Sequence, residues 1–137
     1  AGENLHVMLW PGCVKLTEDI TRFVARESRS FVISASALIR ESDLPNDVPY
    51  RERICTSGET MYDGGSCIAG PEGDWIIPPA VGQETTLTAE LNIEDVLRAR
   101  QNFDPVGHYS RPDVLRLVVD RRHNIAAEFV DDDPRTT

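Results

Sequence analysis

The sequence has few cysteines, and their spacing removes one class of protein. Cys13, Cys55 and Cys67 are widely separated, and none belongs to a Cys-x-x-Cys pair or to a Cys/His pair at zinc spacing. A structural zinc site is therefore not expected. An odd cysteine count without a secretory signal is typical of a reducing compartment, so we expect a cytoplasmic protein.

The sequence is also short of basic residues and of long apolar runs. Lys and Arg number 14 against 23 Asp and Glu, and the net charge of −9 disfavours nucleic acid as a partner, because a binder must neutralise phosphates. No apolar run approaches the roughly 18 residues of a membrane helix, so no membrane partner is expected. The length suits one domain, and residues 121–137, with the run Asp131–Asp133, are expected to form a flexible acidic tail.

Two apolar runs near the start of the chain predict strands. Leu5–Trp10 is closed by Pro11-Gly12, which indicates a buried strand that ends in a turn. Ser30–Ser36 is apolar and β-branched, which indicates a second buried strand. A helical pattern lies between them. This order predicts a βαβ unit, in which neighbouring strands run parallel.

The segment between these strands has the pattern of an amphipathic helix. Thr17 is the expected N-cap residue, because its hydroxyl can accept a hydrogen bond from a free N–H of the first turn. Ile20, Phe23 and Val24 follow the spacing of one helix face. This spacing predicts an amphipathic helix of about three turns, with these three side chains on its apolar face.

The rest of the chain predicts a long loop, a hairpin and one more helix. Residues 41–58 are expected to form the loop, with one helical turn near Tyr50–Ile54. Pro71-Glu72-Gly73 predicts a hairpin turn, and Asn92 predicts the N-cap of a helix. Strands are expected at Ser66–Ala69, Asp74–Ile77, Thr85–Leu91 and Val114–Asp120. The fold class is therefore α/β.

Cys67 and Cys13 are candidate nucleophiles. Cys67 lies inside an apolar strand pattern, which favours a small buried core residue. Gly64-Gly65-Ser66 leads into a strand, so it does not form the strand-to-helix elbow that presents a nucleophile. Cys13 follows a strand end and is better placed for exposure, but the only charged residue close behind it is Lys15.

The run Arg100–Leu117 concentrates polar chemistry in a loop pattern. His108 lies there between glycine and tyrosine, where a histidine can act as a general acid or base or can anchor the loop by hydrogen bonds. Arg111 and Asp113 could form an ion pair that fixes this loop against the sheet. The residues alone show no complete set of nucleophile, base and orienting group.

Four blocks of the sequence, taken together, resemble a known family. They are "GENLHVMLWPG" (Gly2–Gly12), "YDGGSCIAGPEGDWIIPP" (Tyr62–Pro79), "TAELNIEDVLRARQNFD" (Thr88–Asp104) and "NFDPVGHYSRPDVLRL" (Asn102–Leu117). Over residues 2–120 their order and spacing resemble the C-terminal half of nitrilases, in the carbon–nitrogen hydrolase superfamily. The hairpin block is shared with amidases, whereas the last block points to the nitrilase branch.

The resemblance implies a fold and a reaction. The fold would be part of a four-layer α-β-β-α sandwich, which in the family dimerises through its helices and builds spiral oligomers. The reaction would convert a nitrile to a carboxylic acid and ammonia without a cofactor. The family uses a Cys nucleophile, a Glu base and a Lys, because a weakly electrophilic nitrile carbon needs a thiolate and its nitrogen needs a fixed cation or donor.

The sequence departs from the family at the catalytic residues. In the family all three precede the first block, and the Cys lies in a Cys-Trp/Tyr-Glu motif. Glu3, Cys13 and Lys15 do not match those positions. The chain thus resembles a nitrilase portion that begins after its nucleophile, and the first residue, Ala1 in place of Met, agrees with this.

What the resemblance carries over is pocket and scaffold. The residues expected to line the substrate cleft are Trp10, Pro11, Gly12, Ser34 and Ser36. Those expected to shape the site or an oligomer interface are His108, Tyr109, Arg111 and Asp113. The resemblance does not specify which nitrile is preferred. It also does not distinguish a nitrilase from a cyanide hydratase or an amidase.

Three functions follow as alternatives. The chain could be a nitrilase portion that is inactive alone, or a non-catalytic half-fold that serves as a dimerisation or binding module. The third is a stand-alone hydrolase that uses Cys13 or Cys67 with His108. A half-sandwich should expose an apolar sheet face, so the first two predict a homo-oligomer or a partner that is the upstream half of the same fold.

Overall fold

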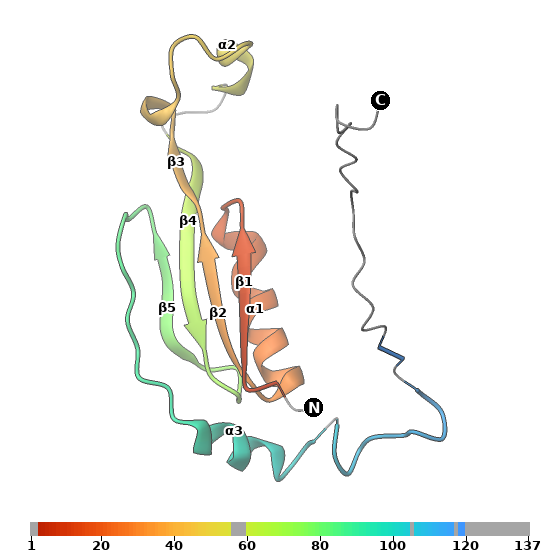
Figure 1. The fold of residues 1–137 in the computed structure, drawn as a ribbon. Helices are drawn as coiled ribbons and strands as arrows, with labels where there is room; N and C mark the ends of the chain where they lie inside the picture. The colour runs from red at the N-terminus through yellow and green to blue at the C-terminus, as the bar shows by residue number, and fades with distance from the viewer. Residues whose placement is uncertain (1–2, 56–59, 105, 117, 120–137) are drawn as a thin grey trace, which may run out of the picture.

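The computed structural model of the chain describes residues 3–55, 60–104, 106–116 and 118–119 (Figure 1). The tail expected over residues 121–137 lies outside these ranges. The elements are β1 (Leu5–Trp10), α1 (Val14–Ser28), β2 (Phe31–Ser36), β3 (Leu38–Arg40), the 3-10 turn η1 (Glu41–Asp43), α2 (Arg51–Ile54), β4 (Thr60–Ala69), β5 (Trp75–Val81) and α3 (Ile93–Arg100). The fold is α/β, as the sequence predicted, and α2 confirms the helical turn expected in the long loop.

The described strands form one sheet organised around β4. β1 pairs in parallel with β2, which confirms the βαβ unit, and Trp10 lies opposite Ser36 in that pairing. β2, β3 and β5 each pair antiparallel with β4. The β4–β5 hairpin is confirmed with longer strands than predicted, and its turn is closed by Gly70 N donating to Asp74 O at 2.9 Å.

The prediction for α1 was wrong about its start and, for two of the three apolar positions, about its buried face. The helix begins at Val14, before the residue expected to cap it. Its buried residues are Thr17, Thr21 and Ala25. Ile20 and Phe23, which were predicted on the apolar face of the helix, are 42% and 67% exposed.

Small polar side chains explain why α1 turns Thr17, Thr21 and Ala25 toward the sheet. The hydroxyl of Thr21 lies 2.6 Å from the Ser34 hydroxyl on β2, and Cys67 Sγ on β4 lies 3.9 Å from the same Thr21 oxygen. These short contacts hold the helix close to the sheet, and a Phe or Ile side chain would not fit between them. Of the three apolar positions, Val24 packs against the core cluster of Ala25, Val32 and Ala69, whereas Ile20 and Phe23 lie on the outer face of the helix.

The face of the sheet opposite α1 is only partly covered, and the prediction that β1 is buried was wrong. Met8 packs toward the core cluster of Ala25, Val32 and Ala69. The alternating residues Leu5, Val7 and Leu9 therefore turn to the other face, where all three are exposed and Leu9 is 80% exposed. This confirms the expectation of an apolar sheet face without a cover among the described residues.

The segment after β5 covers another part of that face without joining the sheet. The strand predicted over Thr85–Leu91 was wrong, because the structure assigns this segment no strand. Together with Ile33 and Ile68 it lines a cavity of about 410 Å³. Pro78 and Pro79 of β5 lack N–H donors, so this edge offers an additional strand fewer hydrogen bonds.

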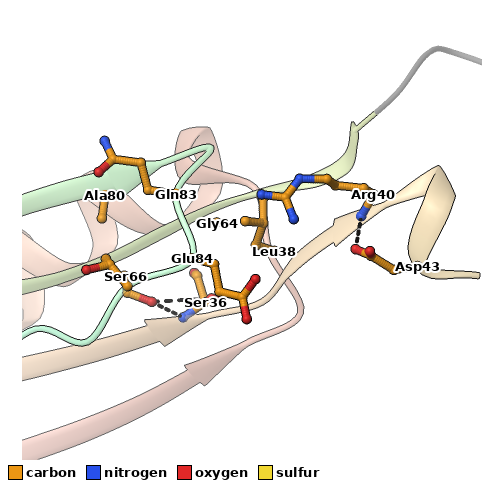
Figure 2. A pocket seen from close by; sticks show the side chains of 10 residues that line it. Ser36, Leu38, Arg40, Asp43, Gly64, Ser66, Ala80, Gln83 and Glu84 are labelled. Carbon is orange, nitrogen blue, oxygen red and sulfur yellow. Dashed lines mark hydrogen bonds between the residues drawn. The ribbon is translucent and has the colours of Figure 1, made fainter.

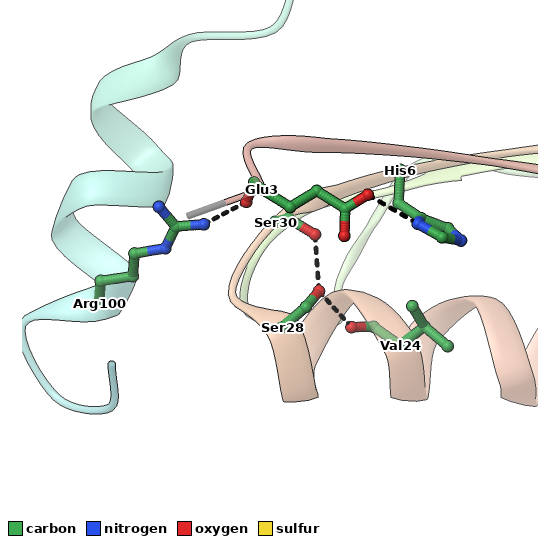
Figure 3. A network of polar contacts seen from close by, with 6 residues as sticks. All are labelled: Glu3, His6, Val24, Ser28, Ser30 and Arg100. Atoms are coloured by element: carbon green, nitrogen blue, oxygen red, sulfur yellow. Dashed lines mark hydrogen bonds and ion pairs between the residues drawn. The ribbon is translucent and has the colours of Figure 1, made fainter. Parts of the chain in front are cut away.

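α3 is joined to the start of the chain. The predicted cap is confirmed, since Asn92 Oδ1 accepts a hydrogen bond from Glu94 N at 3.0 Å. At the other end of the helix, Arg100 donates to the Glu3 carbonyl oxygen (Figure 3). It also donates to Asn4 Oδ1 at 3.2 Å. These contacts place the helix across the end of the sheet at which β1 begins.

The strand predicted over Val114–Asp120 was also wrong for the residues described within it. Residues 114–116 and 118–119 are in no strand, and Leu117 and Asp120 lie outside the described ranges. The segment moves away from the sheet in Figure 1, and its described side chains are exposed. An apolar sequence forms a strand only where a neighbouring strand takes its hydrogen bonds. Among the described helices, none is long and apolar enough to cross a membrane.

Candidate functional site

The candidate site lies at the end of the sheet where the parallel strands β1 and β2 finish. The turn that follows β1 is held by Ala37 N, which donates to Trp10 O at 3.3 Å. Gly12 has φ +138°, and a Cβ there would stand 2.4 Å from Tyr62 Cβ. The turn after Trp10 therefore packs directly on β4, and only glycine fits at this point.

Asp63 of β4 fixes the same turn from the other side. Its Oδ1 accepts a hydrogen bond from Val14 N at 2.9 Å, so it takes one of the free N–H groups at the start of α1. The sequence reasoning missed this residue. The signal was present, because a carboxylate directly before Gly64-Gly65 inside an apolar strand calls for a buried partner.

Two serines join β2 to β4 where their regular pairing stops. Ser66 Oγ accepts a hydrogen bond from Ser36 N at 2.9 Å and lies 3.3 Å from Ser36 O. Beside them is a cavity of about 340 Å³, shown in Figure 2. Its charged lining residues are Arg40, Asp43 and Glu84. The cavity is thus polar and lies at the carboxyl ends of strands, where α/β sheets bind ligands.

Two polar atoms at this end of the sheet lack partners. Trp10 Nε1 and Ser36 Oγ are buried and form no hydrogen bond with any described residue. The two residues are opposite each other in the β1–β2 pairing. Buried polar groups are nearly always hydrogen-bonded, so a bound molecule or a further piece of protein is expected to serve these atoms.

Of the predicted cleft residues, Ser36 lines this cavity. Trp10 lies opposite Ser36 in the β1–β2 pairing, and Pro11 and Gly12 form the turn that follows, but none of these three lines the cavity. Ser34 is placed differently. Its side chain is buried under α1 and its hydroxyl bonds to Thr21, so it holds the helix on the sheet. A substrate-binding role for Ser34 stays a prediction without support from its position.

The two cysteines that are candidate nucleophiles differ in burial. Cys67 is buried, as predicted, and burial raises the pKa of its thiol. Cys13 directly precedes α1 with φ +80° and is half-buried. Among the described residues, no three His, Cys, Asp or Glu side chains gather in a way that could hold a metal ion.

The residues predicted to shape the site or an oligomer interface lie away from this cavity. His108 and Tyr109 are exposed with ring centroids 4.7 Å apart, and Tyr109 lies 4.9 Å from Phe103. The Phe103 ring lies beneath the guanidinium of Arg29, and Arg29 directly follows the last residue of α1. The strand-end cavity is near the other end of α1, which has 15 residues. The helix is about 22 Å long at 1.5 Å per residue, so the two groups are not brought together.

The predicted ion pair between Arg111 and Asp113 is present. Arg111 donates two hydrogen bonds, of 2.8 and 2.6 Å, to the two carboxylate oxygens. These bonds lower the pKa of Asp113. Both side chains are exposed, however, so the pair orders its own loop and does not fix it against the sheet.

The fold is α/β, with a polar cavity at the carboxyl ends of strands. No protein-family model matches the sequence. It is 41% identical to an aliphatic nitrilase of Sinorhizobium fredii over 72% of the chain and 32% of that protein. Identity to an aliphatic nitrilase of Rhodococcus rhodochrous is 33% over 98% of the chain and 38% of that protein.

A third relative is short. A nitrilase-like protein of Saccharomyces cerevisiae is 34% identical over 72% of the chain and 91% of its own length. The chain therefore belongs to the nitrilase family, as the four sequence blocks predicted. It spans about a third of the length of the two bacterial nitrilases.

Proposed function

We propose that the chain supplies the scaffold and one wall of the substrate pocket of a nitrilase, and that it has no activity alone. The reaction would be hydrolysis of a nitrile to a carboxylic acid and ammonia. The observation that carries this is the uncovered apolar face of β1, where Leu9 is 80% exposed. A face of this kind is normally packed against another sheet. Residues 1–120 would form the C-terminal portion of a nitrilase domain.

The residues fit a pocket wall better than a complete active site. Cys13, Cys55 and Cys67 are followed by Val, Thr and Ile, so none lies in the Cys-Trp/Tyr-Glu motif of the family. The unpartnered Trp10 Nε1 and Ser36 Oγ would serve the substrate or the missing part of the fold. The remaining half would bring the nucleophile, base and cation.

The partners in this proposal are a second polypeptide and a small nitrile. The polypeptide would be the upstream half of the same fold, and the assembled enzyme would be a homo-oligomer. His108, Tyr109, Arg111 and Asp113 are exposed in the described residues. They would contribute to an interface, since the structure puts them away from the strand-end cavity.

The test is complementation. The purified chain would be assayed for ammonia release from a panel of aliphatic and aromatic nitriles, alone and mixed with the region of the Sinorhizobium fredii nitrilase that precedes the matched third. We expect release only from the mixture. Changing the nucleophilic Cys of the added polypeptide to Ala should abolish it, whereas Cys13→Ala and Cys67→Ala in this chain should not.

Activity of the chain alone that disappears in Cys13→Ala or Cys67→Ala would overturn the proposal, because a cysteine assigned to the scaffold would then be the nucleophile. A mixture that stays inactive while the two polypeptides bind tightly would favour the second candidate, a non-catalytic half-fold that serves as a dimerisation or binding module. The short yeast relative, matched over 91% of its length, is the observation that favours this second candidate.

A further inference from the structure

The ladder of hydrogen bonds along β4 is interrupted beside the strand-end cavity. The pairing of β2 with β4 runs as far as Ser34 opposite Cys67. Antiparallel pairing resumes with β3, at Leu38 opposite Asp63, after three residues on each side. The register is therefore the same before and after the interruption. A bulge would add a residue to one side only, so this feature is an opening in the ladder.

Two consecutive glycines explain why the ladder opens. Gly64 and Gly65 have φ +82° and +99°, which is far from the backbone conformation of a strand. A chain in this conformation does not present its N–H and C=O groups in the directions that an antiparallel ladder requires. Gly65 also has no room for a side chain, because a Cβ there would stand 3.0 Å from Val14 Cα. Ser36, in the opening, is left without a pairing residue on β4.

The hydroxyl of Ser66 takes the place of the missing backbone partner. Its Oγ accepts a hydrogen bond from Ser36 N at 2.9 Å and donates to Ser36 O at 3.3 Å (Figure 2). One side chain therefore serves both backbone groups of the last residue of β2. Ser36 is in turn paired with Trp10, the last residue of β1. The Ser66 hydroxyl thus holds the ends of both parallel strands.

The opening also shapes the strand-end cavity. Ser36, Gly64 and Ser66 all come from the opening, and all three line this cavity of about 340 Å³. Ser66 lines the cavity of about 410 Å³ beside residues 85–91 as well. A shift of Ser36 relative to β4 would therefore change the wall of the strand-end cavity.

We propose that Ser66 is a positioning residue of the nitrile pocket. Its hydroxyl holds Ser36 in the wall of the strand-end cavity and, through the β1–β2 pairing, holds Trp10 opposite it. Ser66 touches no reacting atom in this proposal and acts on nitrile binding through Ser36. The role in nitrile binding rests on the proposed function, whereas the hold on Ser36 is measured in the chain alone.

The first test follows amide hydrogen exchange in the full chain by NMR. In Ser66→Ala the Ser36 amide loses its acceptor, so it should exchange about tenfold faster or more, the effect of one lost hydrogen bond. The amides of residues 32–34, which lie in the regular ladder, should keep their rates. Ser66→Thr keeps the hydroxyl and should keep the slow exchange of Ser36. Equal rates for Ser36 in Ser66→Ala and in the unsubstituted chain would overturn the proposal.

The matched control is Ser30→Ala. Ser30 is buried directly before β2, and its hydroxyl lies 2.6 Å from that of Ser28, at the other end of the strand. This variant also loses a hydrogen-bonded serine hydroxyl, but it should not change the exchange of Ser36. Near-ultraviolet circular dichroism would confirm that each variant is folded. If Ser66→Ala is not, Ser66→Cys gives a second test, because a thiol is a weaker hydrogen-bond partner and should also speed the exchange of Ser36.

The second test measures nitrile hydrolysis by the variants in the complemented mixture. Ser66→Ala should raise KM about tenfold and leave kcat within about twofold, because the wall contacts the nitrile away from its reacting carbon. Ser66→Thr should restore KM, and Ser30→Ala should change neither constant. An unchanged KM in Ser66→Ala would overturn the role in binding while the proposed function stands. If the unsubstituted mixture is inactive, the proposed function fails instead, and the exchange rate of Ser36 then decides whether Ser66 holds it.

Discussion

Asp63 Oδ1 accepts a hydrogen bond from the backbone N–H of Val14 at 2.9 Å, across 49 residues of sequence. The bond joins the centre of β4 to the first residue of α1, which has no side-chain cap of its own. A carboxylate at a helix N-terminus both satisfies a free N–H group and interacts favourably with the helix dipole. One side chain thus fixes the start of the helix and the turn that follows Trp10.

Replacing Asp63 by Ala should lower the free energy of unfolding by ~1–2 kcal/mol, since the cap is lost and a partly buried N–H is left unpaired. Asp63→Asn keeps an acceptor and should cost less. Urea denaturation measures both changes. Asp74→Ala, at an exposed carboxylate in the hairpin turn, serves as the control. If Asp63→Ala matched that control, the bond would not stabilise the fold.

Gly12 and Gly82 form a matched pair for a test of the turn. Both have positive φ, but a Cβ on Gly12 would lie 2.4 Å from Tyr62 Cβ, whereas a Cβ on Gly82 would meet nothing within 4 Å. Gly12→Ala should therefore destabilise the chain by ~3 kcal/mol or more, from strain and overpacking. Gly82→Ala should cost ~1 kcal/mol, the backbone contribution alone. Thermal unfolding of the two variants distinguishes these values, and equal losses would contradict the close packing of the turn on β4.

The uncovered sheet face predicts association through β1. Leu9→Lys should reduce self-association or binding of the upstream half without reducing stability, because Leu9 is 80% exposed. Light scattering coupled to size-exclusion chromatography gives the mass of each species. Leu16→Lys, on the outer face of α1 and 61% exposed, is the comparison. A larger effect of Leu16→Lys would transfer the interface from the sheet to the helix.

Cys67 predicts a loss of stability at alkaline pH. Burial raises the pKa of its thiol in the folded state, so the unfolded chain ionises first as the pH increases. The contribution of the protonated thiol is complete below the ordinary thiol pKa of about 8.5, and it is lost as the pH rises through the raised folded pKa. In a Cys13→Ser, Cys55→Ser background, the free energy of unfolding should fall more steeply above pH 8.5 than in the same background with Cys67→Ala. Parallel curves would show that the thiol does not titrate differently on folding.

Trp10 predicts selectivity in the complemented enzyme. Its indole lies at the end of β1 with an unpartnered Nε1, so Trp10→Ala should change the ratio of rates on aliphatic and aromatic nitriles by about tenfold, the effect of a reshaped pocket. Trp75→Phe, at the other end of the sheet, should leave the ratio unchanged. An unaltered ratio in Trp10→Ala would remove this residue from the pocket.

The sequence predicted the elements whose pattern is local. The hairpin follows from its Pro-x-Gly turn, and the start of α3 follows from Asn92, whose side chain caps the helix within two residues. The parallel β1–β2 pair follows from the order strand, helix, strand. These features depend on neighbours in the chain, so they could be predicted without knowledge of distant contacts.

The predictions that were wrong concern features that depend on contacts between distant segments. Thr21 is buried because Ser34 offers it a hydrogen bond, and this pairing turns Phe23 outward against the apolar pattern. The segment Thr85–Leu91, predicted as a strand, lies over the face of the sheet with Ile33 and Ile68, and the edge strand β5 contains two prolines that offer no N–H for pairing. For the candidate site, the turn after Trp10 was predicted from Pro11-Gly12, and its place in a substrate cleft stays a prediction. Asp63 was missed because its partner is 49 residues away.

The central position of β4 has a consequence for the order in which the chain folds. β2, β3 and β5 all pair with β4, and β1 pairs only with β2 in the described residues. β4 begins at Thr60, so during synthesis the first two strands leave the ribosome well before the strand that completes their sheet. A lone parallel pair buries little surface, and its pairing closes a long loop, which is slow. The N-terminal third of the chain therefore waits for β4, and in that interval its apolar strands are open to chaperones and to wrong partners.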